Sequence, residues 1–146
     1  MFTFAREPAV LRLKSGAPLP AKELNMSFAI VAVATSIAGL ILGVSWLFAG
    51  NLLFKRWGVE AHTDGLLVGR RLGAAYLGIA FMLFLGRAAP PSDLRSAICA
   101  GLLFALLLLA GLGLFEFKAR RARIGILVSV ALEVILASGF AWVLLA

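Results

Sequence analysis

Three charged residues of this chain, Arg70, Arg71 and Glu133, lie inside its long apolar segments. An ionisable side chain within a membrane-spanning segment is costly, so it commonly belongs to a functional site or to an ion pair. Arg71 lies in the segment 64–86 and Glu133 in the segment 124–145. Counted from the ends of these segments that share a membrane face, their depths are roughly 10 Å and roughly 13 Å. We therefore predict an interhelical ion pair between Arg71 and Glu133.

Ser129 and Tyr76 are the candidate second partners of this pair. Ser129 precedes Glu133 by four residues and so shares its helix face, and Tyr76 follows Arg71 by five. Three roles remain open: a structural clip between two helices, a titrating proton or cation site at Glu133, or a site where Arg71 binds a lipid or quinone headgroup. Arg70 points about 100° away from Arg71 and is expected to reach the lipid headgroups.

Other chemistry is sparse in the sequence. The single cysteine, Cys99, excludes an intrachain disulfide and a multi-cysteine metal site, and it is expected to be a small packing residue in a helix. The single histidine, His62, excludes paired-histidine ligation of haem, chlorophyll or two metals. No nucleophile with a base and no carboxylate dyad can be assembled within the apolar segments. We therefore expect a non-enzymatic protein without a metal or a cofactor.

Four long apolar segments must position these residues. Of the 146 residues 62% are hydrophobic and 14% are charged, whereas roughly a quarter are charged in soluble domains. About 20 apolar residues cross a bilayer as a helix, and the four segments cover about 26–49, 64–86, 94–115 and 124–145. We predict an all-α integral membrane protein, a four-helix transmembrane bundle of two hairpins (26–146) after an extra-membrane tail (1–25). The connection 50–63 is long enough for a short interfacial helix.

Small residues recur at four-residue spacing within these segments. Such pairs let helix backbones approach closely in lipid, and they predict tight packing within the bundle or against another subunit. The pairs are Gly39 with Gly43, Gly69 with Gly73, Ala74 with Gly78, and Ala97 with Gly101.

The net charge of +7 comes from basic residues that flank the apolar segments, a pattern of membrane orientation and not of nucleic-acid binding. An even number of spans places loop 1 (50–63) and loop 3 (116–123) on one face, and their basic residues favour the cytoplasm. Both termini would then lie outside the cell's inner (plasma) membrane, although the basic tail opposes this bias. The residues expected to contact anionic lipid are Lys55, Arg56, Arg70, Lys118, Arg120, Arg121 and Arg123.

Aromatic residues, glycines and an arginine recur along the first hairpin: Leu47-Phe48-Ala49, Phe54, Trp57-Gly58-Val59, Gly65 and Arg71-Leu72-Gly73-Ala74-Ala75-Tyr76-Leu77-Gly78. This stretch resembles small uncharacterised bacterial four-span membrane proteins, and the resemblance implies a four-helix bundle in a bacterial inner membrane. The second hairpin matches them only in hydropathy. The small multidrug exporters also have four spans and a membrane-embedded glutamate, but theirs lies in the first helix, where this chain has no acid.

Two functions are compatible with these features. The first is a non-enzymatic accessory or scaffold subunit of a larger membrane protein complex, favoured by the sparse chemistry and the small-residue faces. The alternative is a small oligomeric transporter or channel with Glu133 and Arg71 in its pathway. The two differ in whether Glu133 faces a water-accessible cavity or is sealed against Arg71. The expected partners are the lipid bilayer and other membrane protein subunits, without nucleic acid.

Overall fold

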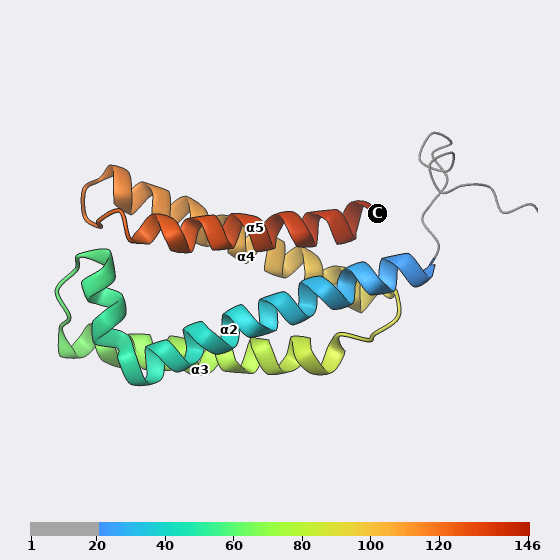
Figure 1. Ribbon diagram of the computed structural model, residues 1–146, viewed down its shortest axis with the longest axis horizontal. Coiled ribbons are helices and arrows are strands. Elements are labelled where there is room, and N and C mark those ends of the chain that lie inside the picture. Colours follow the sequence, from blue (N-terminus) through green and yellow to red (C-terminus); the bar gives the residue numbers. More distant parts are fainter. Residues whose placement is uncertain (1–20) are drawn as a thin grey trace, which may run out of the picture.

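The computed structural model describes residues 21–146, with side chains from residue 27 onward, and this part of the chain is all-α without strands. Its helices are α2 (Ala21–Trp57), α3 (Thr63–Gly86), α4 (Asp93–Lys118) and α5 (Ile126–Leu145). All four are long and apolar enough to cross a membrane. They form two hairpins, α2 with α3 and α4 with α5, that lie side by side (Figure 1). The prediction of four apolar helices is confirmed.

Helix α2 begins earlier than the sequence predicted. Residues 21–25, which were assigned to the extra-membrane tail, belong to its first turns. Alanine, lysine, glutamate and leucine, which make up most of this stretch, are among the strongest helix formers, so local propensity extends the helix beyond the apolar segment. The rest of the predicted tail, residues 1–20, lies outside the described residues.

Helix α2 also continues beyond the end of the first apolar segment. At Ala49 the backbone leaves helical geometry (φ −130°, ψ 29°), and the chain then continues in a helix to Trp57. Figure 1 shows this last part turning away from α3 and toward the α4–α5 hairpin. Gly58 ends it at φ +73°, a left-handed conformation that glycine adopts without strain. The connection 50–63 therefore does contain a short helical segment, which is the last part of α2 after the kink.

Helices α2 and α3 approach closely because their glycines face each other. A Cβ atom on Gly43 would lie 2.9 Å from the carbonyl oxygen of Gly73, and one on Gly73 would lie 2.8 Å from the carbonyl oxygen of Gly43. Neither position has room for a larger residue. By contrast, a Cβ atom on Gly78 or Gly101 would have no atom of the described residues within 4 Å. Two of the four predicted small-residue pairs thus serve contacts inside the chain, and two face outward.

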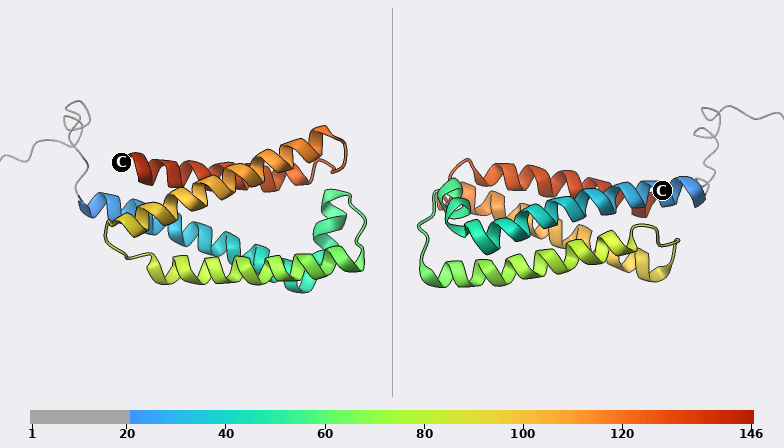
Figure 2. Two further views of the ribbon diagram at one scale, coloured as in Figure 1. Left: turned by 180° about the vertical axis from the view of Figure 1, so that it is seen from behind. Right: turned by 60° about the horizontal axis from the view of Figure 1, so that its bottom comes forward.

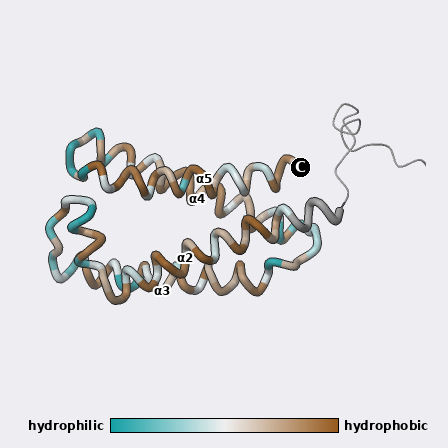
Figure 3. Tube along the Cα trace, in the orientation of Figure 1, coloured by the Kyte–Doolittle hydropathy of each residue, from teal (hydrophilic) through white to brown (hydrophobic). Residues whose placement is uncertain are grey.

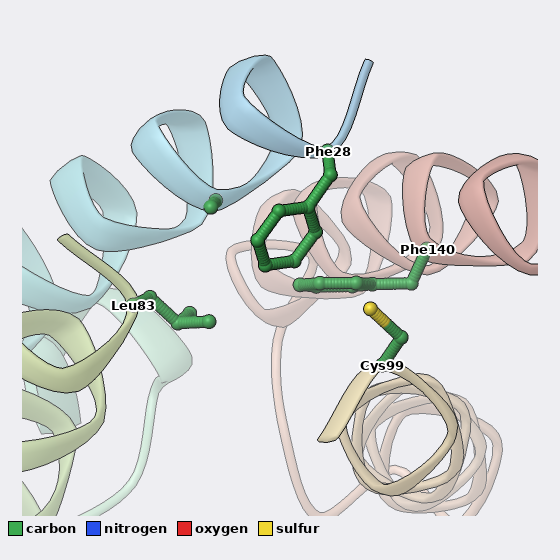
Figure 4. Close-up of a cluster of buried hydrophobic side chains, with 5 residues drawn as sticks. Phe28, Leu83, Cys99 and Phe140 are labelled. Carbon is green, nitrogen blue, oxygen red and sulfur yellow. The ribbon is translucent and has the colours of Figure 1, made fainter. Parts of the chain in front are cut away.

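One end of the bundle is filled by apolar side chains from all four helices. We call it the closed end and define it by the buried cluster shown in Figure 4. Phe140 of α5 has no exposed surface, and Cys99 of α4 is 1% exposed, as expected for a packing residue. The cluster consists of Phe28 and Ala32 of α2, Leu83 of α3, Cys99 of α4 and Phe140 of α5.

Arg95 also belongs to the closed end. Its side chain is buried, its guanidinium donates a hydrogen bond to the carbonyl oxygen of Ala89 (3.1 Å), and it lies 4.8 Å from the centre of the Phe28 ring. The backbone amide of Arg95 donates to the hydroxyl of Ser92, which caps α4 (3.2 Å). Arg95 thus helps to join α4 to α2.

The opposite end is built differently. Loops 1 and 3 meet there, because the backbone amide of Arg123 donates a hydrogen bond to the carbonyl oxygen of Trp57 (2.6 Å). The backbones of α2 and α5 lie close together, whereas those of α3 and α4 are apart, so the hairpins separate along that side (Figure 2). Hydrophilic residues gather in the connections, while the helices between them are largely apolar (Figure 3).

Candidate functional site

A cavity of about 570 Å³ lies between the two hairpins, near the end where loops 1 and 3 meet. Side chains of all four helices line it. On one side Trp46 packs edge-on against both Phe54 and Trp57, with ring centroids 5.5 Å apart in each pair. Cavities of roughly 300 to 1,000 Å³ with apolar and aromatic walls are typical of small-molecule sites. We call this half of the bundle the open end.

The cavity wall includes three acidic side chains and no basic one. Asp64 lies in the first turn of α3, and Glu116 lies near the end of α4, where it pairs with Arg121 (3.5 Å). Glu133 lies deeper, on α5. The described residues contain no group of three or more histidine, cysteine or acidic side chains that could hold a metal ion. The charged side chains in the cavity wall are therefore all carboxylates, and among the described residues they do not form a metal centre.

A second cavity of about 130 Å³ continues toward the middle of the bundle. Tyr76, Ser129 and Glu133 line both cavities, so Glu133 lies where the two meet. Thr35 of α2 lines the smaller cavity but not the larger one, and it is only 8% exposed.

Thr35 and Glu133 hold the buried side-chain atoms that lack a hydrogen-bond partner within the described part of the chain. These atoms are Oγ1 of Thr35 and Oε2 of Glu133. An unsatisfied buried polar atom costs about 1–3 kcal/mol, and a charged one costs more. Both atoms belong to residues that line the smaller cavity. The buried side-chain atoms of residues 27–146 that lack a hydrogen bond thus belong to two residues of one cavity wall.

Sequence analysis identified three of these four polar residues and missed Thr35. A threonine in an apolar helix commonly bonds to its own backbone and then carries no signal of function. The neighbouring Ser36 does so, because its hydroxyl donates to the carbonyl oxygen of Ala32 (2.7 Å). Thr35 makes no such bond. Only the packing of α2 against the other helices reveals the difference between these two adjacent hydroxyls.

The structure does not bring Arg71 and Glu133 together. The backbones of α3 and α5 do not come close to each other, whereas that of α2 lies close to both. The Arg71 side chain is exposed on the outside of α3 and makes no ion pair with any described residue. The prediction rested on equal depth, but depth does not fix the direction in which a residue points around its helix. Tyr76 and Ser129, named as second partners, do share the cavities with Glu133.

The basic residues expected to contact anionic lipid are all exposed. All but Arg70 lie near the meeting point of loops 1 and 3, so they form a basic rim around the open end. Contact with lipid stays a prediction. The residues are Lys55, Arg56, Arg70, Lys118, Arg120, Arg121 and Arg123.

Comparison with known proteins finds no family model, no curated protein and no solved structure that matches this chain. The resemblance of the first hairpin to small bacterial four-span proteins therefore stays a prediction. Function is inferred from the two cavities and the groups that line them, since a shared fold would not by itself define an activity.

Proposed function

We propose that this chain is a non-enzymatic, multi-pass protein of a bacterial inner membrane, which binds a small amphipathic molecule between its hairpins and acts as a small transporter. The observation that carries the proposal is the position of Glu133. This acid lines the junction of two cavities, and its Oε2 atom has no partner in the described chain. An acid held inside a membrane bundle without a paired base is a strong candidate for a ligand or ion pathway.

The location in a membrane is supported by the outer surfaces of the helices. Large apolar side chains such as Phe81, Phe104 and Ile135 are at least 65% exposed, which is stable only where lipid or another apolar surface covers them. The basic rim favours placing loops 1 and 3 in the cytoplasm. The larger cavity would then lie toward the cytoplasmic face, with Glu133 between it and the centre of the membrane.

A pair of variants on α5 tests whether the cavity binds ligand. Ser129→Phe would fill the junction of the cavities, whereas Val128→Phe adds the same ring at an adjacent position that is 54% exposed on the outer surface. The probe is Nile red, a neutral amphipathic dye, and binding is measured by quenching of tryptophan fluorescence in phosphatidylcholine nanodiscs. Empty nanodiscs correct for partitioning into lipid.

We expect saturable binding to the unchanged protein and to Val128→Phe, and at least about tenfold weaker binding to Ser129→Phe, a loss of about 1.4 kcal/mol. Equal binding to both variants, or no saturable binding to any of the three proteins, would contradict the proposal. Transport would then be measured with reconstituted vesicles, where Ser129→Phe should reduce the flux of the bound compound.

An accessory or scaffold subunit remains the second candidate, favoured by the two small-residue pairs that face outward. Gly101 and its neighbour in the pair, Ala97, are exposed, and a Cβ atom on Gly101 would have no described atom within 4 Å. If a partner helix packs there, Gly101→Leu should release a co-purifying protein in mild detergent. Gly111→Leu is the matched control, because a Cβ atom on Gly111 of α4 would also have no described atom within 4 Å, and this variant should retain the co-purifying protein.

A further inference from the structure

The charged groups that line the cavities are of one sign. Asp64, Glu116 and Glu133 contribute carboxylates, and no lysine, arginine or histidine lines either cavity. The basic residues nearby, including Arg121 beside Glu116, lie outside the lining. An anionic ligand would therefore meet repulsion at every charged group of the site.

The surroundings of Glu133 also favour a cationic ligand over a neutral one. A buried carboxylate is stabilised only when a positive group or several hydrogen-bond donors compensate its desolvation. The described chain provides neither to Oε2 of Glu133, and Arg71 points elsewhere. A neutral ligand such as Nile red can pack against the aromatic wall but leaves Oε2 of Glu133 uncompensated, so it should bind more weakly than a cation of similar size. A cation would supply the missing charge.

The smaller cavity adds acceptors suited to the head of such a cation. The hydroxyl of Thr35 has an unused oxygen there, and the side chains of Tyr76 and Ser129, which make no hydrogen bond to any described residue, line the same volume. Three helices, α2, α3 and α5, thus direct oxygen-bearing groups toward one region. An ammonium group donates up to three hydrogen bonds, which is what a carboxylate flanked by hydroxyl oxygens can accept.

The larger cavity provides walls for an apolar body. Trp46, Phe54 and Trp57 form a contiguous aromatic group at its side. Aromatic faces attract cations and also pack well against apolar rings. On the basis of the proposed ligand-binding function, we infer that the ligand is a hydrophobic organic cation, with its charged head between Glu133 and Thr35 and its apolar body against the aromatic wall.

The experiment compares two probes that differ in the sign of their charge. Tetraphenylphosphonium and tetraphenylborate have nearly the same size and shape but opposite charge. Binding to the full chain in nanodiscs of zwitterionic phosphatidylcholine is measured by equilibrium dialysis, with empty nanodiscs subtracted. We expect one saturable site per chain for the phosphonium and none for the borate. Equal binding of the two ions would overturn the inference.

Variants at Glu133 locate the charge that is responsible. Glu133→Gln should weaken binding of the phosphonium at least about tenfold, and Glu60→Gln, in the exposed part of loop 1, should leave it unchanged. If Glu133→Gln fails to fold, Glu133→Asp keeps the charge and should keep the preference for the cation. Unchanged binding in folded Glu133→Gln would contradict the inference.

Thr35→Val tests the position of the head group. The probe is 1-adamantanamine, whose ammonium can donate hydrogen bonds, whereas tetraphenylphosphonium has no N–H group. A single hydrogen bond contributes about 0.5–1.5 kcal/mol, so Thr35→Val should weaken binding of the amine about two- to tenfold and leave the phosphonium unaffected. Equal effects on both probes, or none on the amine, would contradict the placement of the head beside Thr35.

Failure of this inference can be told apart from failure of the proposed function. If Nile red binds and Ser129→Phe abolishes its binding, but neither cation binds, the ligand-binding function stands and the cationic class is wrong. If none of the probes binds, both are wrong. A phospholipid retained at one molecule per chain, and displaced by no probe, would show that lipid occupies the cavity and would also overturn the inference.

Discussion

The two ends of the bundle are built on different principles. At the closed end, Phe28, Leu83, Cys99 and Phe140 bring one or more apolar side chains from every helix into a single buried cluster. At the open end, the same four helices surround a cavity of about 570 Å³ that contains carboxylates and hydroxyls. Close packing supplies stability, whereas incomplete packing leaves room for a ligand. We therefore propose that the closed end mainly stabilises the fold and that the open end binds the ligand.

The two ends also differ in the polarity of their side chains. The open end is lined by Asp64, Glu116 and Glu133 together with large aromatic rings, whereas the closed-end cluster consists of apolar side chains and Cys99. The kink at Ala49 then carries Phe54 and Trp57 across the cavity toward loop 3. The cavity is thus covered from the side of loops 1 and 3 by the end of α2.

The largest expected effect on stability is at the closed end. Phe140→Ala removes a side chain with no exposed surface and should reduce the free energy of unfolding by about 3–5 kcal/mol. Trp142→Ala, on the same helix, removes a ring that is 61% exposed and should cost much less. Thermal unfolding in detergent measures both. Equal losses would mean that the buried cluster does not hold the helices together.

Substitutions at two glycines of α3 test the close packing of α2 against α3. Gly73→Ala would place a Cβ atom against backbone of α2, and overpacking of this kind costs about 1–3 kcal/mol. Gly78→Ala meets nothing within 4 Å and should stabilise the protein slightly, because alanine favours helix by about 1 kcal/mol over glycine. Thermal unfolding in detergent again measures both changes. A neutral Gly73→Ala would show that the hairpin tolerates a wider separation.

Hydropathy predicted the four helices well, because the length of an apolar segment is set by the bilayer it must cross. The glycine pairs of α2 and α3 were also visible in the sequence, since helix spacing places them on one face. The separation of Arg71 from Glu133 and the positions of Thr35 and Arg95 were not predictable in this way. Each depends on which helices become neighbours and on the rotation of each helix about its axis, and depth along the membrane determines neither.

The smallest expected effect is the coupling between Arg71 and Glu133. Since Arg71 is exposed on α3 and the backbones of α3 and α5 lie apart, a double-mutant cycle of Arg71→Gln and Glu133→Gln should give a coupling free energy near zero, below about 0.5 kcal/mol. Unfolding in detergent provides the four free energies. A coupling free energy of about 1.5 kcal/mol or more would instead support the predicted ion pair as a structural clip between the two helices.

The central claim, that an open cavity lies beside Glu133 while the other end is sealed, is tested most directly by thiol labelling in nanodiscs. Ser129→Cys places a thiol in the cavity wall, Val128→Cys places one on the outer surface, and the native Cys99 reports on the closed end. The reagent is a small cationic methanethiosulfonate, which reacts with thiols that water can reach. We predict rapid labelling of Ser129→Cys alone. Equal protection of all three thiols, or faster reaction at Cys99, would contradict the account.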